Sequence, residues 1–187
     1  MIDERALHEA LISMIEAIGD DPDREGLSDT PRRITAMYSE FFAGLDQNPH
    51  DALKTGFEEG HHEMVVLQDV PFFSICEHHF LPFQGTADIG YIPNGRVAGA
   101  SKLARALDIL ARRPQLQERL TSQLADSISE CLDAVGVGVV IEAEHLCMSL
   151  RGAKKPGSRI VTSAMRGTLH DKHEVRQQFD SLRWRNS

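Results

Sequence analysis

Two short stretches of the chain, far apart in the sequence, carry thiol and imidazole side chains at spacings that suit a metal ion. The first contains Cys76 and His79, three residues apart, and the second contains His145 and Cys147. Zinc accepts thiolate and imidazole ligands together, and a catalytic zinc site keeps one position open for water. The third cysteine, Cys131, falls on the apolar side of an expected helix. Two thiols and one imidazole remain as ligands, and this set predicts a zinc ion that activates water.

The same residues also have a simpler interpretation, in which Cys76 and Cys147 are ordinary buried thiols, as cysteine often is. The neighbouring histidines count against it. His78 precedes His79, and an alternating strand through residues 145–147 would place His145 and Cys147 on one face. Imidazoles titrate near neutral pH, so His78 and His145 could serve as general acids and bases beside a metal. They could equally be structural.

Basic side chains form a second group, in a chain whose overall charge is negative. Lys102 and Arg105 lie three residues apart at the start of an expected helix, so they share a face. The helix N-terminus adds its own partial positive charge. Arg151 follows Cys147 by four residues. These side chains either bind a polyphosphate near the metal or form an ordinary solvated surface.

Gln117 and Glu118 fall in the first turn of the next expected helix. A carboxylate at such a position often only stabilises the start of the helix. It can also accept two parallel hydrogen bonds from the ring N–H and the exocyclic amine of guanine. The residues by themselves leave both interpretations open.

Composition limits the class of protein. The chain has 187 residues, is 41% hydrophobic and 26% charged, and carries a net charge of −8. These values are typical of a soluble globular domain and do not suit a general nucleic-acid binder. An odd number of cysteines makes no disulfide framework, which favours a reducing compartment. We find no signal peptide and no apolar run near the roughly 20 residues of a membrane helix. We therefore expect a cytoplasmic protein that binds neither nucleic acid nor membrane.

Hydrophobic periodicity predicts a mixed order of elements. The expected elements are helices over 4–18 and 30–43, a loop over 45–62, strands over 64–67, 70–75 and 81–92, helices over 101–113 and 115–134, strands over 137–143 and 159–165, and a last helix over 171–183. Strands, then helices, then strands, preceded by helices, is the order of an α+β fold with an antiparallel sheet.

Motifs along the chain, in this order, closely resemble those of the GTP cyclohydrolase I family. They lie at residues 76–80 (CEHHF), 101–105 (SKLAR), 113–120 (RPQLQERL), 145–148 (HLCM) and 161–167 (VTSAMRG). The resemblance covers about residues 5–183 and implies the tunnelling fold, with an antiparallel four-stranded sheet and two helices per subunit. It implies an N-terminal helical region over 1–62 and a catalytic domain over 63–187. It also implies a homodecamer of two stacked pentamers, with active sites between subunits.

The implied reaction converts GTP and water to formate and 7,8-dihydroneopterin triphosphate, the first step toward folate and other pterins. By position, Cys76, His79 and Cys147 resemble the ligands of one zinc ion per subunit, which activates the water that attacks carbon 8 of guanine. His145 would protonate nitrogen 7 of guanine, and His78 would serve that and later proton transfers.

Substrate contacts follow from the same resemblance. Glu118, helped by Gln117, would hold the guanine edge. The triphosphate would be held by Lys102, Arg105 and Arg151, and Ser101 would touch ribose or phosphate.

Some positions depart from the family pattern. Many relatives carry lysine near Ala36, where it adds to the phosphate site, and Arg32 or Arg33 could substitute for it here. Thr86 and Asp88 stand where relatives often have lysine and histidine. These differences leave every zinc and proton-transfer candidate in place.

Two rival interpretations stay open. One is a different enzyme on the same fold, such as a pterin synthase or a nitrile reductase relative; the reductases use a catalytic cysteine without this zinc triad. The other is a zinc module without activity, in which His78 or His145 closes the site as a fourth ligand.

Overall fold

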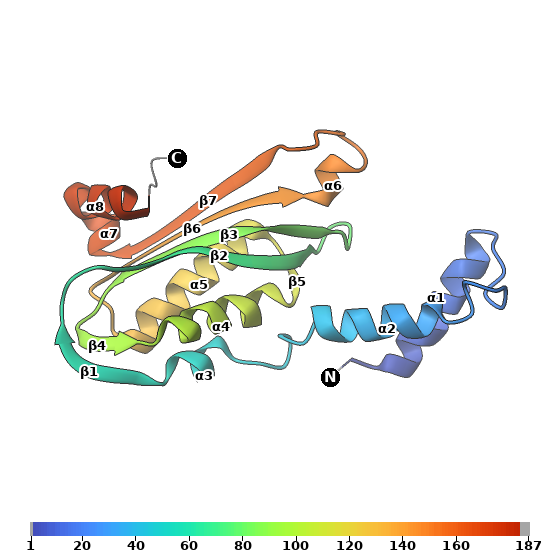
Figure 1. Cartoon of the computed structure of the whole chain (residues 1–187), viewed down its shortest axis with the longest axis horizontal. Helices are drawn as coiled ribbons and strands as arrows, with labels where there is room; N and C mark the ends of the chain where they lie inside the picture. Colours follow the sequence, from blue (N-terminus) through green and yellow to red (C-terminus); the bar gives the residue numbers. More distant parts are fainter. Residues whose placement is uncertain (1, 184–187) are drawn as a thin grey trace.

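The computed structural model describes residues 2–183, and Figure 1 shows their arrangement. The helices are α1 (Glu4–Ala17), α2 (Thr30–Phe41), α3 (Pro49–Leu53), α4 (Ala100–Ala111), α5 (Gln117–Leu132), α6 (Leu146–Ser149), α7 (Thr168–Asp171) and α8 (His173–Arg183). The strands are β1 (Gly56–His61), β2 (Val65–Cys76), β3 (Pro82–Ile92), β4 (Gly95–Ala98), β5 (Pro114–Gln115), β6 (Gly136–His145) and β7 (Arg159–Gly167). Within residues 2–183, no helix combines the length and the apolar character that crossing a membrane requires.

The main sheet has the strand order β5-β2-β3-β6-β7. Its long strands pair antiparallel, β2 with β3, β3 with β6 and β6 with β7. This confirms the predicted α+β class and its antiparallel sheet. The short β5 adds a parallel pair with the end of β2, where Ile75 lies opposite Pro114 and Cys76 opposite Gln115. Strand β5 was not predicted, because two residues are too few to show a strand pattern.

Helices α4 and α5 cover one face of this sheet, and Figure 1 shows them side by side beneath it. Their leucines pack on alternate residues of β3 and β6, and burial of this apolar surface is the main stabilising term. Phe83, Ile89 and Tyr91 of β3 have no exposed surface. Gly85 lies where β3 approaches β6 closely, since a Cβ there would be 1.8 Å from the carbonyl oxygen of Glu142.

The opposite face of the sheet is polar at one end and covered at the other. At the covered end, Leu169 of α7 and Phe179 of α8 are fully buried against Val140 and Met165. At the polar end, side chains line a cavity of about 370 Å³ that includes Gln84, Thr86, Glu142, Glu144 and Arg159. Thr86, one of the departures from the family pattern, therefore lines this cavity.

Asp88, the other departure on β3, anchors the C-terminal helix. Its carboxylate accepts a hydrogen bond from the backbone N–H of Asp69 at 3.0 Å and lies 3.4 Å from a guanidinium nitrogen of Arg183. Asp69 is in the left-handed region, with φ of 53°, where β2 changes register against β3 between Leu67 and Val70. The acidic residue at position 88 thus joins β2, β3 and α8.

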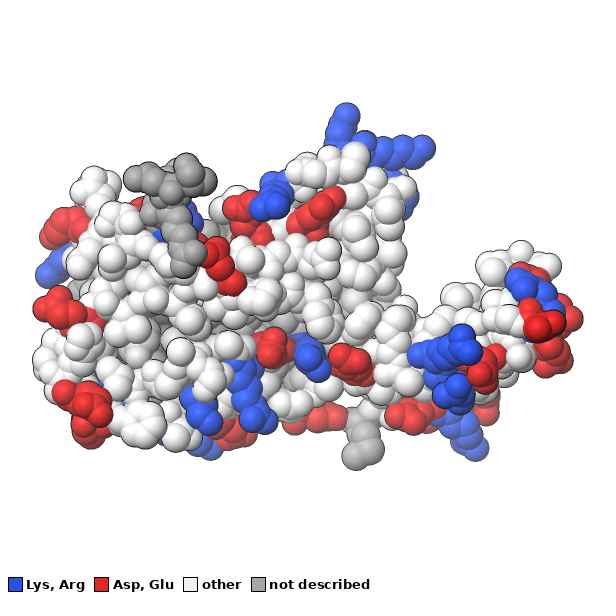
Figure 2. Space-filling model, viewed as in Figure 1, with Lys and Arg blue, Asp and Glu red and all other residues white. Residues whose placement is uncertain are grey.

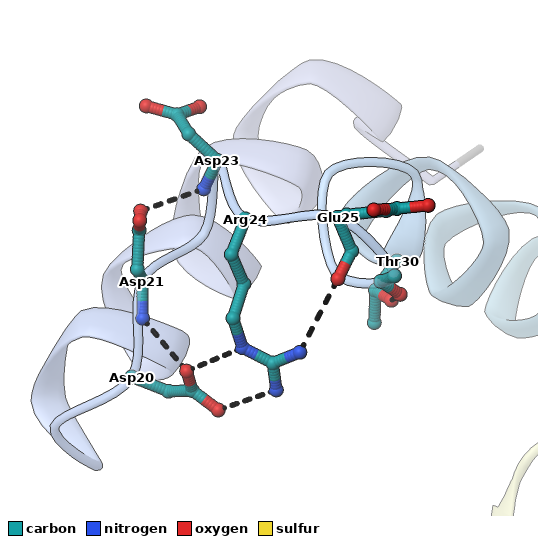
Figure 3. A network of polar contacts seen from close by, with 7 residues as sticks. Asp20, Asp21, Asp23, Arg24, Glu25 and Thr30 are labelled. Carbon is teal, nitrogen blue, oxygen red and sulfur yellow. Dashed lines mark hydrogen bonds and ion pairs between the residues drawn. The ribbon is translucent and has the colours of Figure 1, made fainter.

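Helices α1 and α2 extend away from the sheet as an arm (Figure 1), and an acidic loop connects them. Figure 3 shows that Arg24 donates hydrogen bonds to both carboxylate oxygens of Asp20, at 2.7 and 2.8 Å. The backbone N–H of Asp21 also donates to Asp20, at 2.9 Å. These contacts, led by Arg24, lower the pKa of Asp20 from 3.8 to about 2.

Three predicted elements differ from the structure. The expected loop over 45–62 contains α3 and β1, and β1 pairs with β4, with Gly56 opposite Ala98. Asn48 and Pro49, which were interpreted as loop residues, instead start α3: the Asn48 side chain accepts a hydrogen bond from the His50 N–H. Five of the six β1 residues are exposed, so β1 has no alternating pattern to detect.

The expected strands over 64–67 and 70–75 are one strand, β2, because the register shift does not end the pairing. The expected last helix is interrupted at Lys172, which is extended and separates α7 from α8. The division of the chain after residue 62 stays a prediction.

Candidate metal and nucleotide site

The predicted metal ligands converge at one end of the main sheet. Cys76 is the last residue of β2, His79 lies in the turn before β3, and Cys147 lies in α6, directly after β6. Their ligand atoms all lie within 4.8 Å of one another. Figure 1 shows the turn between β2 and β3 and the helix α6 at the same end of the sheet.

A tight turn brings Cys76 and His79 together. The N–H of Phe80 donates to the carbonyl oxygen of Cys76, and the N–H of Cys76 donates to that of Leu81, each at 2.9 Å. Phe80 adopts φ of 53° at this turn. Its ring meets the ring of Phe42, the residue that ends α2, edge to face with centroids 5.8 Å apart. The turn that carries Cys76 and His79 therefore contacts the N-terminal arm.

Cys147 does not lie on an alternating strand, so that prediction was wrong. Strand β6 ends at His145, opposite Phe83 of β3, and the chain then turns into α6. The first turn of this short helix, rather than a shared strand face, directs Cys147 toward Cys76.

The donor set suits a metal ion, and zinc in particular accepts two sulfurs with one imidazole nitrogen. Burial raises the pKa of the Cys147 thiol, and the neighbouring Cys76 raises it further. A bound dication reverses that tendency, because it stabilises the thiolate form of its ligands. Cys76, His79 and Cys147 would hold the ion, and a zinc with three protein ligands would leave a position for water.

His145 lies next to this triad and is nearly buried, with 8% of its surface exposed. Its ring stacks on the ring of Phe83, with centroids 4.6 Å apart and planes 6° from parallel. Its Nε2 lies 2.7 Å from the amide oxygen of Gln117. Burial lowers the pKa of His145, and the charge of Glu118 opposes that shift.

Gln117 and Glu118 begin α5 at the same end of the sheet, and they differ sharply in exposure. Gln117 is 1% exposed, whereas Glu118 is exposed. Among residues 2–183, no hydrogen bond or ion pair is shown for the Glu118 carboxylate. Its oxygens are therefore free to accept hydrogen bonds from a ligand.

An ion pair that was not predicted from the sequence joins the turn that carries Cys76 and His79 to α5. Arg119 Nη1 and Nη2 lie 2.5 and 3.0 Å from the two carboxylate oxygens of Glu77, and this contact lowers the pKa of Glu77. The N–H of Glu77 also donates to the carbonyl oxygen of Gln115 at 3.1 Å. Both residues lie in the recognised motifs, but their pairing becomes visible only once the fold brings the motifs together.

Arg151 reaches the metal ligands from the loop between β6 and β7. Its Nη1 lies 3.0 Å from Nε2 of His79, which must accept because a guanidinium only donates. Glu144 holds this loop, since it accepts hydrogen bonds from the Ser149 hydroxyl at 2.6 Å and the Gly157 N–H at 3.1 Å. Figure 2 shows Lys and Arg side chains projecting from this corner of the molecule.

His78 is exposed, and its ring centroid lies 6.3 Å from that of His79. It is therefore accessible to solvent beside the ligands. Arg32 and Arg33 lie in the N-terminal arm, where both approach Asp29, at 3.2 and 3.4 Å.

Ser101, Lys102 and Arg105 are not brought to the triad within one chain. They lie in the first turns of α4, and Figure 1 shows that α4 starts at the end of the sheet opposite to α6. Lys102 and Arg105 line a separate cavity of about 350 Å³, together with Asp46 and Asp51. None of the described residues that line this cavity belongs to the triad.

Comparisons with known proteins point to one family. The family model described as GTP cyclohydrolase I matches residues 7–183. The chain is 55% identical over 184 residues to the GTP cyclohydrolase 1 of Dehalococcoides mccartyi (strain BAV1), covering 97% of each chain. It is 54% identical over 182 residues to that of Halalkalibacterium halodurans, again covering 97% of each. It is 58% identical over 168 residues to that of Carboxydothermus hydrogenoformans, covering 89% of this chain and 88% of the relative.

Among solved structures, the chain is similar to the apo form of the archaeosine synthase QueF-Like, with a TM-score of 0.45 and 20% identity over 56% of this chain and 93% of that one. A likeness at that level bears on neither the fold nor the activity. The family model covers nearly the whole chain, and the relatives match 89 to 97% of it. The chain therefore belongs to the GTP cyclohydrolase I family.

Proposed function

We propose that this protein is a zinc-dependent GTP cyclohydrolase I, which hydrolyses GTP to formate and 7,8-dihydroneopterin triphosphate. This is the first committed reaction toward folate and other pterins. One observation carries the proposal: the triad of Cys76, His79 and Cys147 lies at the same end of the sheet as His145 and Glu118. A metal ion with a purely structural role would need neither a nearly buried histidine nor a free carboxylate beside it.

Cys76, His79 and Cys147 would hold the zinc ion. When bound there, zinc supplies a Lewis acid and lowers the pKa of a coordinated water toward neutrality. His145 donates a proton to nitrogen 7 of guanine, which makes carbon 8 more electrophilic. His78, which is exposed beside the ligands, serves proton transfers there and in the later ribose opening and rearrangement.

Glu118 selects the base. Its carboxylate accepts one hydrogen bond from the guanine ring N–H and one from the exocyclic amine, with Gln117 in support. Once bound GTP covers this carboxylate, a purine without the amine would leave one of its oxygens without a partner, which weakens binding. Specificity for guanine over hypoxanthine follows from this penalty.

The triphosphate requires basic side chains from more than one place in the fold. Arg151 lies at the triad, while Lys102, Arg105 and Ser101 lie at the other end of the sheet. We propose that a second copy of the chain brings its α4 start to the triad, so that each active site lies between subunits. Tunnelling-fold subunits in a cytoplasmic homodecamer of two stacked pentamers provide this arrangement.

The decisive experiment incubates the purified protein with zinc and GTP, then measures formate and the fluorescent oxidised neopterin product. We expect both products, and neither in Cys147→Ser. Cys131→Ser is the matched control, because Cys131 is packed against the core outside the triad and its loss should leave both products. Zinc binding without either product would instead favour a structural zinc or a different enzyme on this fold.

Two further variants test the assigned roles. His145→Ala should retain zinc but lose most turnover, and normal turnover would contradict its part in proton transfer. Glu118→Ala should retain zinc but weaken GTP binding, and unchanged affinity for GTP would refute the guanine contact.

A further inference from the structure

The buried amide of Gln117 is fully occupied by contacts within the chain. Its Nε2 lies 3.0 Å from the carbonyl oxygen of Ile141, 3.0 Å from that of Ile160 and 3.1 Å from the hydroxyl of Thr162. Its Oε1 lies 2.7 Å from Nε2 of His145. Strands β6 and β7 and the start of α5 thus meet at one side chain that is 1% exposed.

These contacts permit one orientation of the amide. The carbonyl oxygens of Ile141 and Ile160 only accept hydrogen bonds, so the NH₂ group of Gln117 must face them. The amide oxygen then faces His145. An oxygen accepts and cannot donate, so Nε2 of His145 must carry a hydrogen.

A closed chain of hydroxyl groups fixes the remaining directions. The Thr121 hydroxyl donates to the backbone carbonyl of Gln117 at 2.7 Å. A hydroxyl has only one hydrogen to donate, and Thr121 uses it in that bond. Thr121 therefore accepts from the Thr162 hydroxyl, also at 2.7 Å. Thr162 is therefore left to accept from the amide of Gln117. Every donor in the network is used, and rotating the amide would set oxygens against oxygens.

The other ring nitrogen of His145, Nδ1, is open. For residues 2–183 the structure shows no hydrogen-bond partner for it, and no buried side-chain nitrogen or oxygen among them lacks a partner. Nδ1 must therefore reach the solvent of the site. Stacking on Phe83 holds the plane of the ring, so Nδ1 keeps one direction.

We propose that Gln117 is a positioning residue that holds His145 as the Nε2–H tautomer, so that Nδ1 is the nitrogen that passes a proton to nitrogen 7 of guanine. The inference rests on the proposed function, and it replaces a direct guanine contact by Gln117. The donor is the doubly protonated ring, which has taken its second hydrogen from solvent at Nδ1. The transfer breaks this Nδ1–H bond, forms the bond from hydrogen to guanine nitrogen 7 and leaves the neutral Nε2–H tautomer. The ring keeps its Nε2–H and its bond to Gln117 throughout, so no other group has to move.

The first test separates kcat from KM in zinc-loaded protein. Gln117→Met keeps the volume of the side chain and removes its amide. We expect kcat to fall by about 10- to 100-fold, the usual effect of losing a group that orients a reacting histidine. KM for GTP and the zinc content should stay close to those of the wild type. A rise in KM with kcat preserved, the pattern expected of Glu118→Gln, would show a guanine contact and overturn the inference.

Thr162→Val is the matched control for general loosening of the network. It removes one acceptor of the Gln117 amide but leaves both backbone carbonyls and the contact with His145. We expect its loss in kcat to be at least fivefold smaller than that of Gln117→Met. Equal losses in the two variants would mean that the network acts only through stability, and would overturn the positioning role.

The second test needs no variant, so misfolding cannot obscure it. Long-range ¹H–¹⁵N correlation spectra of the wild-type, histidine-labelled protein assign the tautomer of His145, with His145→Ala identifying its signals. The Nε2–H pattern is expected, and an Nδ1–H tautomer would overturn the inference. If the wild type released no formate from GTP, the proposed function would fail and the catalytic part of the inference with it, whereas the tautomer would still be measured.

Discussion

Phe83 offers a test of how much the stacking on His145 contributes to turnover. The side chain is fully buried and touches two rings: His145 in parallel at 4.6 Å and Phe72 edge to face at 5.9 Å. Phe83→Leu keeps an apolar side chain there but removes both contacts. Phe72→Leu is the matched control, because it removes the contact with Phe83 and leaves the one with His145.

The expected magnitudes follow from these contacts. An aromatic pair contributes about 0.5 to 1.5 kcal/mol beyond its buried area. With the unfilled volume, each variant should lose about 1 to 3 kcal/mol of unfolding free energy. If the whole stacking energy orients His145, losing it lowers kcat by about 2- to 10-fold, because about 1.4 kcal/mol corresponds to a factor of ten. Phe72→Leu should keep kcat within about twofold of the wild type.

The assay pairs urea denaturation at fixed protein concentration with formate release at saturating GTP. Protein concentration must be constant, since assembly contributes to apparent stability. The reasoning fails if Phe83→Leu loses stability but retains full kcat, or if Phe72→Leu loses as much kcat as Phe83→Leu.

Two further predictions concern stability. Asp20 has a pKa of about 2 in the folded chain against 3.8 ordinarily, so its contribution is complete above about pH 4 and is lost as the pH falls toward 2. Thermal melts from pH 5 to pH 2 should show this loss, and Asp20→Asn should show less of it. In Gly85→Ala the new Cβ would lie 1.8 Å from a backbone oxygen, so we expect a loss above about 4 kcal/mol. Circular dichroism and denaturation midpoints will measure it, against Gly99→Ala, whose Cβ would meet only Lys102 Cγ at 3.7 Å.

The parts of the fold that were predicted from the sequence are those that bury a periodic face. In α5, Leu120, Leu124, Ile128 and Leu132 repeat every four residues, and in β3 the buried residues mostly alternate, because each element buries one face. Strands β1 and β5 escaped prediction for the opposite reason. Strand β1 is almost wholly exposed and β5 has two residues, so neither shows an alternating pattern. Both form only because a strand elsewhere in the chain pairs with them.

The convergence of Cys76, His79 and Cys147 could be predicted, because few residue types bind metal ions such as zinc and they recur at recognisable spacings. The way Cys147 reaches the site was not, since the end of β6 and the turn into α6 depend on pairing with β3. The contacts of Gln117 were also beyond the sequence. Two of its partners are backbone carbonyls on different strands. Every residue has a backbone carbonyl, so the sequence does not indicate which of them a side chain will contact.

The distance between the start of α4 and the metal triad has a genetic consequence. If each active site combines the triad of one copy with Lys102 and Arg105 of the next, a copy damaged in only one of these elements impairs one site and still supplies its intact element to the other. Two inactive variants, Cys147→Ser and Arg105→Ala, could then complement each other when co-expressed. Random mixing in equal amounts would leave about a quarter of the sites with two intact halves. Mixed rings would regain activity that neither parent has, so an allele scored as null by itself would be partly rescued by another.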